Sequence, residues 1–429
     1  MTERDLTVCI ISYFFTTTHP GYGTRCPLMI GEILLKLGYK VKVITAMPPS
    51  LRHQAGKRYK RRLFSTEQAS HNMTLYRIWT PDIREESIPR KLILYLWFLF
   101  LSHIGLLFIG KIDTIVRIGP YPPLIVFPEF LFSKIKKAPL LIHLGDLWPD
   151  VLFTFMRIRS MLTKQMITIV TLLSYRLASG IVTITSSIKN GIIHYGIDES
   201  KMFAIELGVD CDTFRPIDNV PSPVPLLGQD RFIVMYSGNF GPAYDFNTLL
   251  QAAKQVGEIN SNILFVIRGS GALESFIRTK ISELGLSNVL VLGTVDSIRE
   301  LVQILNMADV LVLPMSNVKV QETAHPSKIF EYLACGKPVV CCATGELRKL
   351  ITDSQIGIVV EPSDPKALAV AILNLYKDEL KRGILGKRAR KFVCKDFSYQ
   401  AITSKWKVLI ERYSKATNAN ECANAMSAL

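Results

Sequence analysis

The sequence predicts an α/β protein made of two doubly wound domains in tandem, with a cleft between them at the carboxyl ends of the strands. Short apolar strands alternate with helical stretches in the first half of the chain, and the same alternation restarts after a proline-rich polar segment. The chain has 429 residues and is 48% hydrophobic, which is enough to bury two cores. We therefore expect a first domain over 1–215, a linker over 216–230 and a second domain over 231–397.

The first half of the chain predicts one well-defined helix and a series of buried strands. The helix spans 25–37 and ends at Gly38, because glycine is the preferred residue just after a helix. Continuous runs of Val, Ile and Leu are typical of strands in a parallel sheet that is covered on both faces. Five strands are predicted, over 6–13, 41–45, 112–117, 140–143 and 180–185.

The second half repeats the pattern and closes with a separate helix. Helices are predicted over 246–256 and 272–284. A final amphipathic helix over 398–415 is expected to pack back on the first domain. Six strands are predicted, over 232–237, 263–268, 289–292, 310–313, 339–342 and 357–360.

Net charge and cysteine content indicate which cellular compartment and which binding partners to expect for the protein. The net charge is +15, and basic residues cluster at 57–62 and 134–137. The eight cysteines contain no C-x-x-C pair, which favours reduced thiols in the cytoplasm and no zinc site. We expect no cleavable signal peptide, since residues 1–5 are polar and the following apolar run has only the length of a strand.

The most apolar segment, 92–109, lies close to this basic half and admits three interpretations. It is a buried helix, an interfacial helix, or a transmembrane segment at the lower limit of length. A position between two strands of one sheet argues against a span. Basic clusters with apolar surface favour a peripheral position on the anionic inner face of the cell membrane. No nucleic-acid partner is expected, because known modules and interleaved aromatics are absent.

The segment 325–338 predicts a short helix that carries a nucleotide-binding pair. Apolar side chains fall on one face of this helix, while Lys328 and Glu331 lie three positions apart on another. The helix N-terminus offers unpaired N–H groups to an anion, with Ser327 and Lys328 beside them. Glu331 can accept hydrogen bonds from a diol. Phosphate at one end and ribose at the other outline a nucleotide site.

Glycine-rich turns follow several of the predicted strands, and each can bring backbone N–H groups against a phosphate. Alone, each is equally typical of a tight turn. Together they occur at one edge of the second sheet, close to the Lys328 helix. A further turn in the first domain precedes the helix that begins at Arg25. The candidate residues are Gly238, Asn239, Arg268, Gly269, Gly271 and Val295 in the second domain, and Gly21 and Gly23 in the first.

In the first domain, His143 and Asp146 stand at the tip of a buried strand and are candidate catalytic residues. A core histidine is an equally good interpretation of His143, because it alternates with the apolar face of the strand. Asp210 and Asp212 look like a metal-binding pair but lack a third ligand, so no metal site is predicted.

These segments together resemble a family 4 glycosyltransferase with the GT-B fold. The resemblance covers the N-terminal strand with its glycine loop and the segments 145–150, 208–216, 237–241, 268–271 and 326–340. Residues 145–150 together with 326–328 also resemble the branch that builds O-antigen, capsule and related polysaccharides on lipid carriers, including fucosamine transferases. The resemblance implies that Glu331 holds the donor ribose and that Lys328 with Ser327 binds the diphosphate. It also implies that Arg268, Gly269 and Gly271 line the phosphate and base pocket, with Val295 near the base.

The chain departs from the family pattern in two regions that bear on the donor. Thr323 stands where the family has a second glutamate, and Asn239 with Tyr244 and Asp245 stands in the region where the family usually has arginine and lysine. The diphosphate charge must then be met by Lys328, Arg268 or Arg25.

The resemblance implies a metal-independent, retaining transferase that needs no cofactor. It would move a sugar from a nucleoside diphosphate sugar, with UDP favoured, to a polyprenyl-diphosphate-linked saccharide. A nucleotide-sugar 2-epimerase of the same fold is an alternative, and a non-catalytic membrane-bound subunit is another. A nicotinamide dehydrogenase is disfavoured, because the acid that follows a complete dinucleotide fingerprint is absent.

Overall fold

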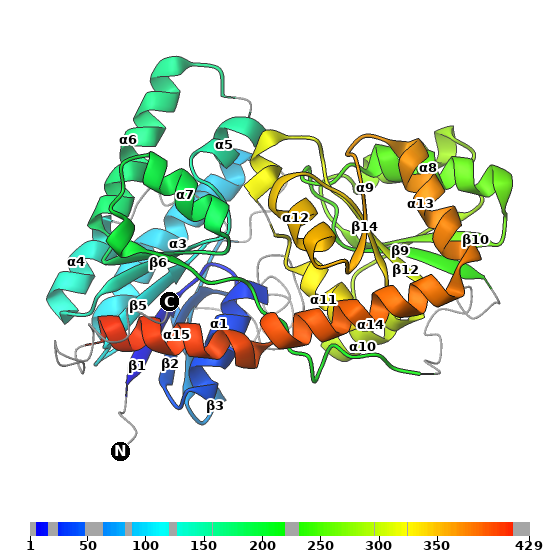
Figure 1. Cartoon of the computed structure of the whole chain (residues 1–429). Coiled ribbons are helices and arrows are strands. Elements are labelled where there is room, and N and C mark those ends of the chain that lie inside the picture. Colours follow the sequence, from blue (N-terminus) through cyan, green and yellow to red (C-terminus); the bar gives the residue numbers. More distant parts are fainter. Residues whose placement is uncertain are drawn as a thin grey trace. The chain divides into compact units, whose positions relative to one another are not determined.

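The computed structural model describes residues 6–15, 25–47, 63–81, 88–119, 127–156, 158–218, 231–295, 297–323 and 325–414. The chain divides into two compact units (Figure 1). The N-terminal unit extends to Glu206 and takes up the chain again from Ile402, whereas the C-terminal unit holds Leu207–Ala401. The division at Glu206 lies upstream of the predicted linker, of which 219–230 fall outside the described residues.

The N-terminal unit is built on an eight-stranded sheet in the order β3-β4-β2-β1-β5-β6-β7-β8. All neighbouring strands are parallel except β3, which pairs antiparallel with β4. The strands are β1 (Thr7–Ile11), β2 (Lys40–Ala46), β3 (Phe64–Ser70), β4 (Met73–Ile78), β5 (Thr114–Ile118), β6 (Leu140–Leu144), β7 (Gly180–Thr183) and β8 (Met202–Ala204). Every residue of β1, β5 and β6 is buried, which is why these strands read as continuous apolar runs.

The helices of this unit include one that returns from the far end of the sequence. Helix α15 (Tyr399–Tyr413) enters the N-terminal unit at Ile402, and the Trp406 ring stacks on His143 with 6.1 Å between centroids. The other helices are α1 (Arg25–Lys36), α3 (Ile88–Phe108), α4 (Phe127–Lys136), α5 (Asp150–Phe155), α6 (Met161–Leu177) and α7 (Ser186–His194).

The C-terminal unit contains a six-stranded, fully parallel sheet in the order β11-β10-β9-β12-β13-β14. Its strands are β9 (Phe232–Asn239), β10 (Ile263–Ser270), β11 (Val289–Leu292), β12 (Val310–Pro314), β13 (Val339–Cys342) and β14 (Gly357–Val360). The order reverses between β9 and β12, so the carboxyl ends of β9 and β10 lie beside a topological switch point.

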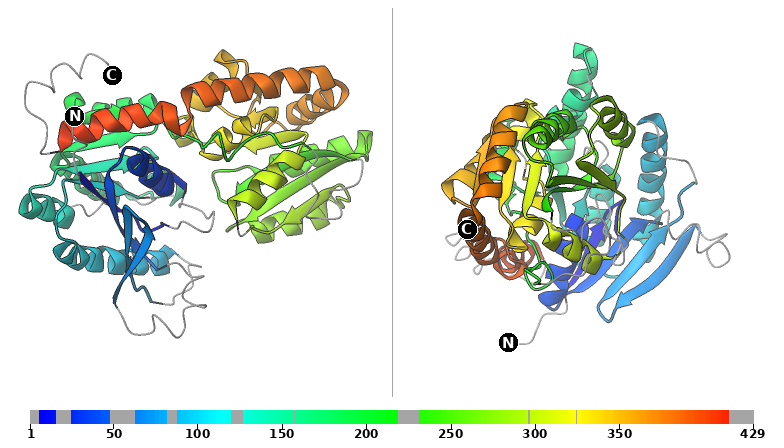
Figure 2. Two further views of the ribbon diagram at one scale, coloured as in Figure 1. Left: turned by 90° about the horizontal axis from the view of Figure 1, so that it is seen from below. Right: turned by 90° about the vertical axis from the view of Figure 1, so that its right-hand side faces the viewer.

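Helices cover both faces of this second sheet (Figure 2). They are α8 (Phe246–Ile259), α9 (Glu274–Glu283), α10 (Ile298–Met307), α11 (Lys328–Ala334), α12 (Gly345–Asp353), α13 (Pro365–Lys377) and α14 (Glu379–Asp396). Asp245 caps α8 by accepting a hydrogen bond from the Thr248 N–H at 3.0 Å. Both halves of the chain thus form the parallel α/β sheets that the sequence predicted.

Within the described part of the chain, no helix combines the length and the apolar character needed to cross a membrane. This finding applies to the described residues of α3, where the sequence left a transmembrane segment at 92–109 open.

Candidate functional site

The glycine loops at the ends of β9 and β10 come into direct contact. Gly269 stands opposite Gly238 in the strand register, and Ser270 stands opposite Asn239. A Cβ atom on Gly269 would lie 1.8 Å from the Gly238 carbonyl oxygen, and the φ of Gly269 is +143°. No side chain fits at this position. The two strand ends can therefore approach each other this closely only because glycine has no side chain.

Lys328 places its ammonium group against this glycine contact. Its Nζ donates a hydrogen bond to the Tyr236 hydroxyl at 2.7 Å. It also lies 3.8 Å from the centroid of the Tyr244 ring and 4.4 Å from that of Tyr236. A Cβ on Gly238 would come within 2.2 Å of Nζ, so the missing side chain makes room for the ammonium. Burial lowers the pKa of Lys328 well below its ordinary value, with Arg268 adding to the effect and Glu331 opposing it.

Arg268 is a second cation at the same strand ends, and it is buried. Its side chain is 5% exposed, and its Nη1 donates to the Ser237 hydroxyl at 3.0 Å. No group among the described residues accepts a hydrogen bond from its buried Nε. Burial lowers the pKa of Arg268, while Tyr332 and Glu331 act in the opposite direction. A buried donor without a partner is costly, and it suits a site that receives a further acceptor.

Glu331 supplies negative charge near both cations. It lies three residues after Lys328 in α11 and is half-buried. The next residue, Tyr332, fixes the helix to β9, because its hydroxyl accepts from the Ser237 N–H at 2.8 Å and donates to the Ser237 carbonyl at 2.7 Å. The structure thus brings Lys328, Arg268 and Glu331 together within the C-terminal unit.

The start of α11 differs from the prediction of free backbone donors. The Ile329 N–H donates to the Pro326 carbonyl at 3.0 Å, and the Phe330 N–H donates to the Ser327 carbonyl at 3.2 Å. The Ser327 side chain makes no capping hydrogen bond. Because the first turn closes on itself, those two N–H groups are not open to an anion, and that part of the prediction is wrong.

The remaining donor-site candidates lie around the same loops or outside the described residues. Asn239 faces the glycines, since a Cβ on Gly271 would lie 2.7 Å from its Oδ1. Val295 is half-buried and follows β11, the edge strand next to β10. Gly21 and Gly23 lie outside the described residues.

His143 and Asp146 stand at the carboxyl end of β6, in different surroundings. The His143 ring is 3% exposed and lies between the Trp406 ring and the Cys26 sulfur, which is 3.8 Å from Nδ1. Burial lowers the pKa of His143 to about 4, so the ring is neutral at pH 7. Asp146 is half-buried, and burial raises the pKa of its carboxyl to about 6. These contacts favour the core interpretation of His143 and leave Asp146 able to change its protonation state.

Sequence reasoning missed the two tyrosines around Lys328. Tyr236 was part of an apolar strand, and Tyr244 was treated only as a departure from the family pattern. Spacing carries no signal for this contact, because the lysine is more than eighty residues away. Asp210, by contrast, has a local role: its carboxylate accepts hydrogen bonds from the Thr213 hydroxyl at 2.7 Å and the Asp212 N–H at 3.1 Å.

The comparisons with known proteins agree with this geometry. Residues 222–392 match the family model described as glycosyl transferases group 1. The matched segment lies in the C-terminal unit and is similar to this family over less than half of the chain. This match includes the strands and loops that carry Lys328, Arg268 and Glu331.

The individual curated relatives of this chain are distant. A D-inositol 3-phosphate glycosyltransferase from Geodermatophilus obscurus is 28% identical over 209 residues, which are 46% of this chain and 44% of the relative. WcaL of Escherichia coli K12, named for colanic acid biosynthesis, is 26% identical over 222 residues, 50% of this chain and 52% of that protein. The chain therefore spans about half the length of these curated relatives.

Structural similarity extends over both units of the chain. The crystal structure of HepE from Anabaena in complex with UDP and glucose matches with a TM-score of 0.67 at 16% identity. The match covers 94% of this chain and 99% of that one. It confirms the predicted GT-B fold, with two Rossmann-like α/β domains.

Proposed function

We propose that this protein is a retaining glycosyltransferase. It moves a sugar from a nucleoside diphosphate sugar, with UDP favoured, to a lipid-linked saccharide during synthesis of a cell-surface polysaccharide. The observation that carries this proposal is the pair of cations, half-buried Lys328 and buried Arg268, beside Glu331 and the glycine contact of β9 and β10. Two cations removed from bulk solvent and one buried donor without a partner among the described residues favour an anionic ligand such as a diphosphate.

The chemistry follows from where charge develops during the transfer. The bond between the sugar C1 and the donor phosphate oxygen breaks, and negative charge grows on the leaving diphosphate. Lys328 and Arg268 stabilise that charge, because fixed cations in a site of low dielectric act strongly on it. A new bond forms between C1 and the acceptor oxygen on the same face of the sugar, and the acceptor proton passes to an oxygen of the leaving phosphate. Glu331 accepts hydrogen bonds from the ribose hydroxyls.

The choice of UDP and of a polysaccharide pathway rests on similarity. HepE binds UDP and glucose in its crystal structure, and WcaL is named for colanic acid biosynthesis. In the N-terminal unit, Asp146 is the stronger catalytic candidate, since its carboxyl titrates near neutral pH and His143 is enclosed by Cys26 and Trp406. Gly21 and Gly23 stay proposed phosphate contacts.

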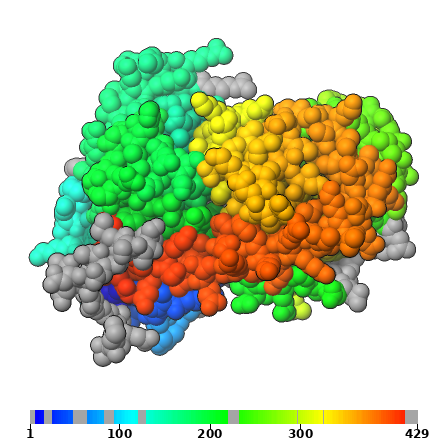
Figure 3. Space-filling view, in the orientation of Figure 1, coloured from blue at the N-terminus to red at the C-terminus, as the bar shows by residue number. Residues whose placement is uncertain are grey.

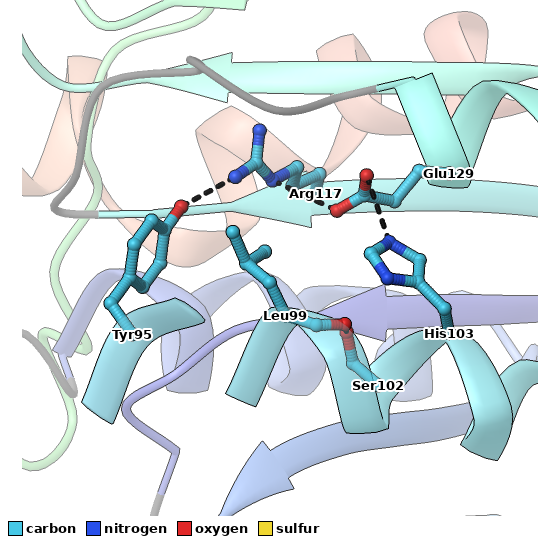
Figure 4. Close-up of polar contacts among 6 residues, drawn as sticks. All are labelled: Tyr95, Leu99, Ser102, His103, Arg117 and Glu129. Carbon is cyan, nitrogen blue, oxygen red and sulfur yellow. Dashed lines mark hydrogen bonds and ion pairs between the residues drawn. The ribbon is translucent and has the colours of Figure 1, made fainter. Parts of the chain in front are cut away.

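A peripheral membrane position belongs to the same proposal, and helix α3 supports it. The inner face of α3 is held by polar contacts (Figure 4). The Arg117 side chain donates to the Tyr95 hydroxyl at 2.5 Å and pairs with Glu129 of α4, which also contacts His103 of α3 at 3.2 Å. Glu129 is fully buried, and Arg117 and Tyr95 are nearly so. This network fixes which face of α3 turns outward.

The outward faces of α3, α4 and α6 carry large apolar side chains. Phe100 and Phe108 of α3 are 67% and 78% exposed, and Leu162 of α6 is 70% exposed. Figure 3 shows α6, in teal, at the surface of its unit. Exposed apolar residues on the three helices are Ile93, Leu96, Trp97, Phe100, Leu107, Phe108, Leu131, Ile135, Met161, Leu162, Met166, Ile169, Val170 and Leu173. Apolar surface of this extent is typical of an interaction site.

The charges on the same helices and their connecting segments favour an anionic partner. Among the described residues between 93 and 181, the charged side chains that are exposed to solvent are all basic. They are Lys111, Lys134, Lys137, Arg159 and Arg176. The four acidic residues in that stretch are buried or half-buried. Exposed apolar and basic residues on the same helices and their connecting segments suit the surface of an anionic bilayer, where a lipid-linked acceptor is held.

An activity screen with matched variants tests the proposed function. Purified protein is offered UDP-, GDP- and dTDP-sugars with prenyl-diphosphate-linked acceptors. We expect transfer from a UDP-sugar. Lys328→Met should lower kcat about 10²–10³-fold, because one fixed donor to the leaving group is removed. Glu331→Gln should cause a smaller loss. Lys254→Met, at an exposed position on α8, serves as the control.

Three outcomes contradict the proposal. Unchanged turnover in Lys328→Met and Glu331→Gln would remove the assigned site. Conversion of a UDP-sugar without any acceptor would identify an epimerase instead. Donor binding without turnover in the presence of lipid extract would identify a non-catalytic subunit.

A further inference from the structure

We propose that Tyr236 and Tyr244 are positioning residues that hold the Lys328 ammonium beside the glycine loops while leaving its charge available to the donor diphosphate. The proposal rests on the function proposed above and names two residues that act through Lys328.

The first step is that the ammonium is confined on two sides by aromatic rings. Nζ is 3.8 Å from the Tyr244 centroid and 4.4 Å from the Tyr236 centroid, both within the range of a cation–π interaction. The two rings meet edge to face with 5.4 Å between their centroids. Phe246 packs against both tyrosines, with its ring centroid 5.1 Å from that of Tyr236 and 6.4 Å from that of Tyr244. The tyrosines therefore cannot move independently of the hydrophobic core.

The second step is a chain of hydrogen bonds that ends in a loop backbone. Lys328 donates to the Tyr236 hydroxyl at 2.7 Å, and this hydroxyl donates to the Asn239 carbonyl at 2.5 Å. Asn239 follows Gly238, whose missing side chain leaves the space that Nζ occupies. These hydrogen bonds thus fix the position of the ammonium relative to the loop that is proposed to face the phosphates.

The third step concerns charge. A carboxylate in contact with Lys328 would have to be displaced before a diphosphate could pair with the lysine. The direct contacts of Nζ described above are instead two aromatic rings and a neutral hydroxyl, which orient a cation without cancelling its charge. Glu331 acts on Lys328 from the same helix and opposes the lowering of the lysine pKa that burial causes. The lysine is therefore held in place and still able to pair with an anion.

Binding of UDP without the sugar tests this inference by calorimetry. Tyr244→Leu removes the ring, and we expect a loss of affinity of about ten-fold, which matches a desolvated cation–π contact. Tyr244→Phe keeps the ring and should stay within about two-fold of wild type. Tyr236→Phe removes the hydroxyl between Lys328 and Asn239 and should also weaken binding. In turnover, these losses should appear in kcat as well as in the donor KM, because Lys328 also stabilises the charge on the leaving diphosphate.

A double-mutant cycle separates positioning from a general structural effect. In the Lys328→Met background, Tyr244→Leu should cause no further loss of UDP affinity, because the tyrosine acts only through the lysine. Additive losses would overturn the inference, as would equal losses in Tyr244→Phe and Tyr244→Leu. If UDP binding follows the cycle but no sugar is transferred, the proposed function fails and the positioning role stands. If the wild-type chain binds no nucleoside diphosphate, both fail.

Discussion

At the scale of single residues, the site is built by burying charge that the fold does not need. Lys328 and Arg268 contribute no ion pair that holds elements of the described structure together, and burial lowers the pKa of both. Arg390 shows the structural alternative, since it donates to the Phe214 and Cys211 carbonyls and thereby ties α14 to the preceding segment. Cations that weaken the free protein but suit an anion are characteristic of a binding site.

Asp146 gives a prediction about stability and pH. Burial raises its pKa to about 6 in the folded protein, above the ordinary value of 3.8. The folded state therefore holds the proton more tightly than the unfolded state does, and this residue lowers stability as pH rises from about 4 to about 6. Asp146→Asn should stabilise the protein at pH 7.5 by about 1–3 kcal/mol and leave it unchanged near pH 4. Denaturant unfolding at the two pH values measures this.

The same variant tests a catalytic role. If the ionised Asp146 carboxylate takes part in transfer, activity of the wild type should fall below about pH 6, and Asp146→Asn should be inactive while remaining folded. A stabilised and fully active Asp146→Asn would mean that the carboxyl is only a buried group. A shift of stability with the opposite sign would show that the carboxylate has a cationic partner in the folded state.

At the scale of elements, the close approach of the carboxyl ends of β9 and β10 depends on glycine. Gly269→Ala would force a Cβ to within 1.8 Å of the Gly238 carbonyl oxygen, so one strand end must move. We expect a loss of stability of more than about 2 kcal/mol, together with loss of UDP binding. Gly293→Ala is the matched control, because nothing lies within 4 Å of that position and its φ is not in the left-handed region.

Thermal unfolding and UDP titration measure both glycine variants. The control should change stability by less than about 0.5 kcal/mol, as is usual at open positions. Equal effects in the two variants would show that the close approach of β9 and β10 is not required.

The elements that the sequence predicted are the ones with a single strong pattern. Buried strands such as β9, β10 and β12 appear as apolar runs, and Gly38 marks the end of α1 within two residues. The hairpin of β3 and β4 was not predicted, because Phe64–Ser70 is a polar strand with little burial. The site was predicted where motifs cluster, at Lys328, Arg268 and the glycines. Tyr244 was missed since only tertiary packing brings its ring to Lys328.

At the scale of the whole molecule, the basic surplus and the apolar surplus fall on the same unit. The net charge is +15, and α3, α4 and α6 combine exposed apolar side chains with basic residues. The C-terminal domain, which carries the family match, explains the donor chemistry but not this surface. The lipid-linked acceptor of the proposed function would account for both features, because such a substrate is held at a membrane.

Membrane binding gives the last prediction, at the scale of the whole chain. Replacing Phe100 and Phe108 by glutamate removes two exposed apolar anchors of α3 and adds charge that an anionic bilayer repels. We expect flotation with vesicles of anionic lipid to fall by at least about ten-fold, since each buried aromatic side chain is worth about 1.5–3 kcal/mol. Ile259→Glu, at an exposed apolar position of the C-terminal unit, is the control and should bind as the wild type does.

Binding of the wild type should be weaker on zwitterionic vesicles and in high salt. Transfer to a short-chain, soluble acceptor should survive in the Phe100→Glu, Phe108→Glu variant, because the donor residues are in the other unit. Retained flotation of that variant would show that the apolar face does not meet a lipid surface. If the wild type formed a dimer and the variant a monomer, the apolar face would meet a protein instead.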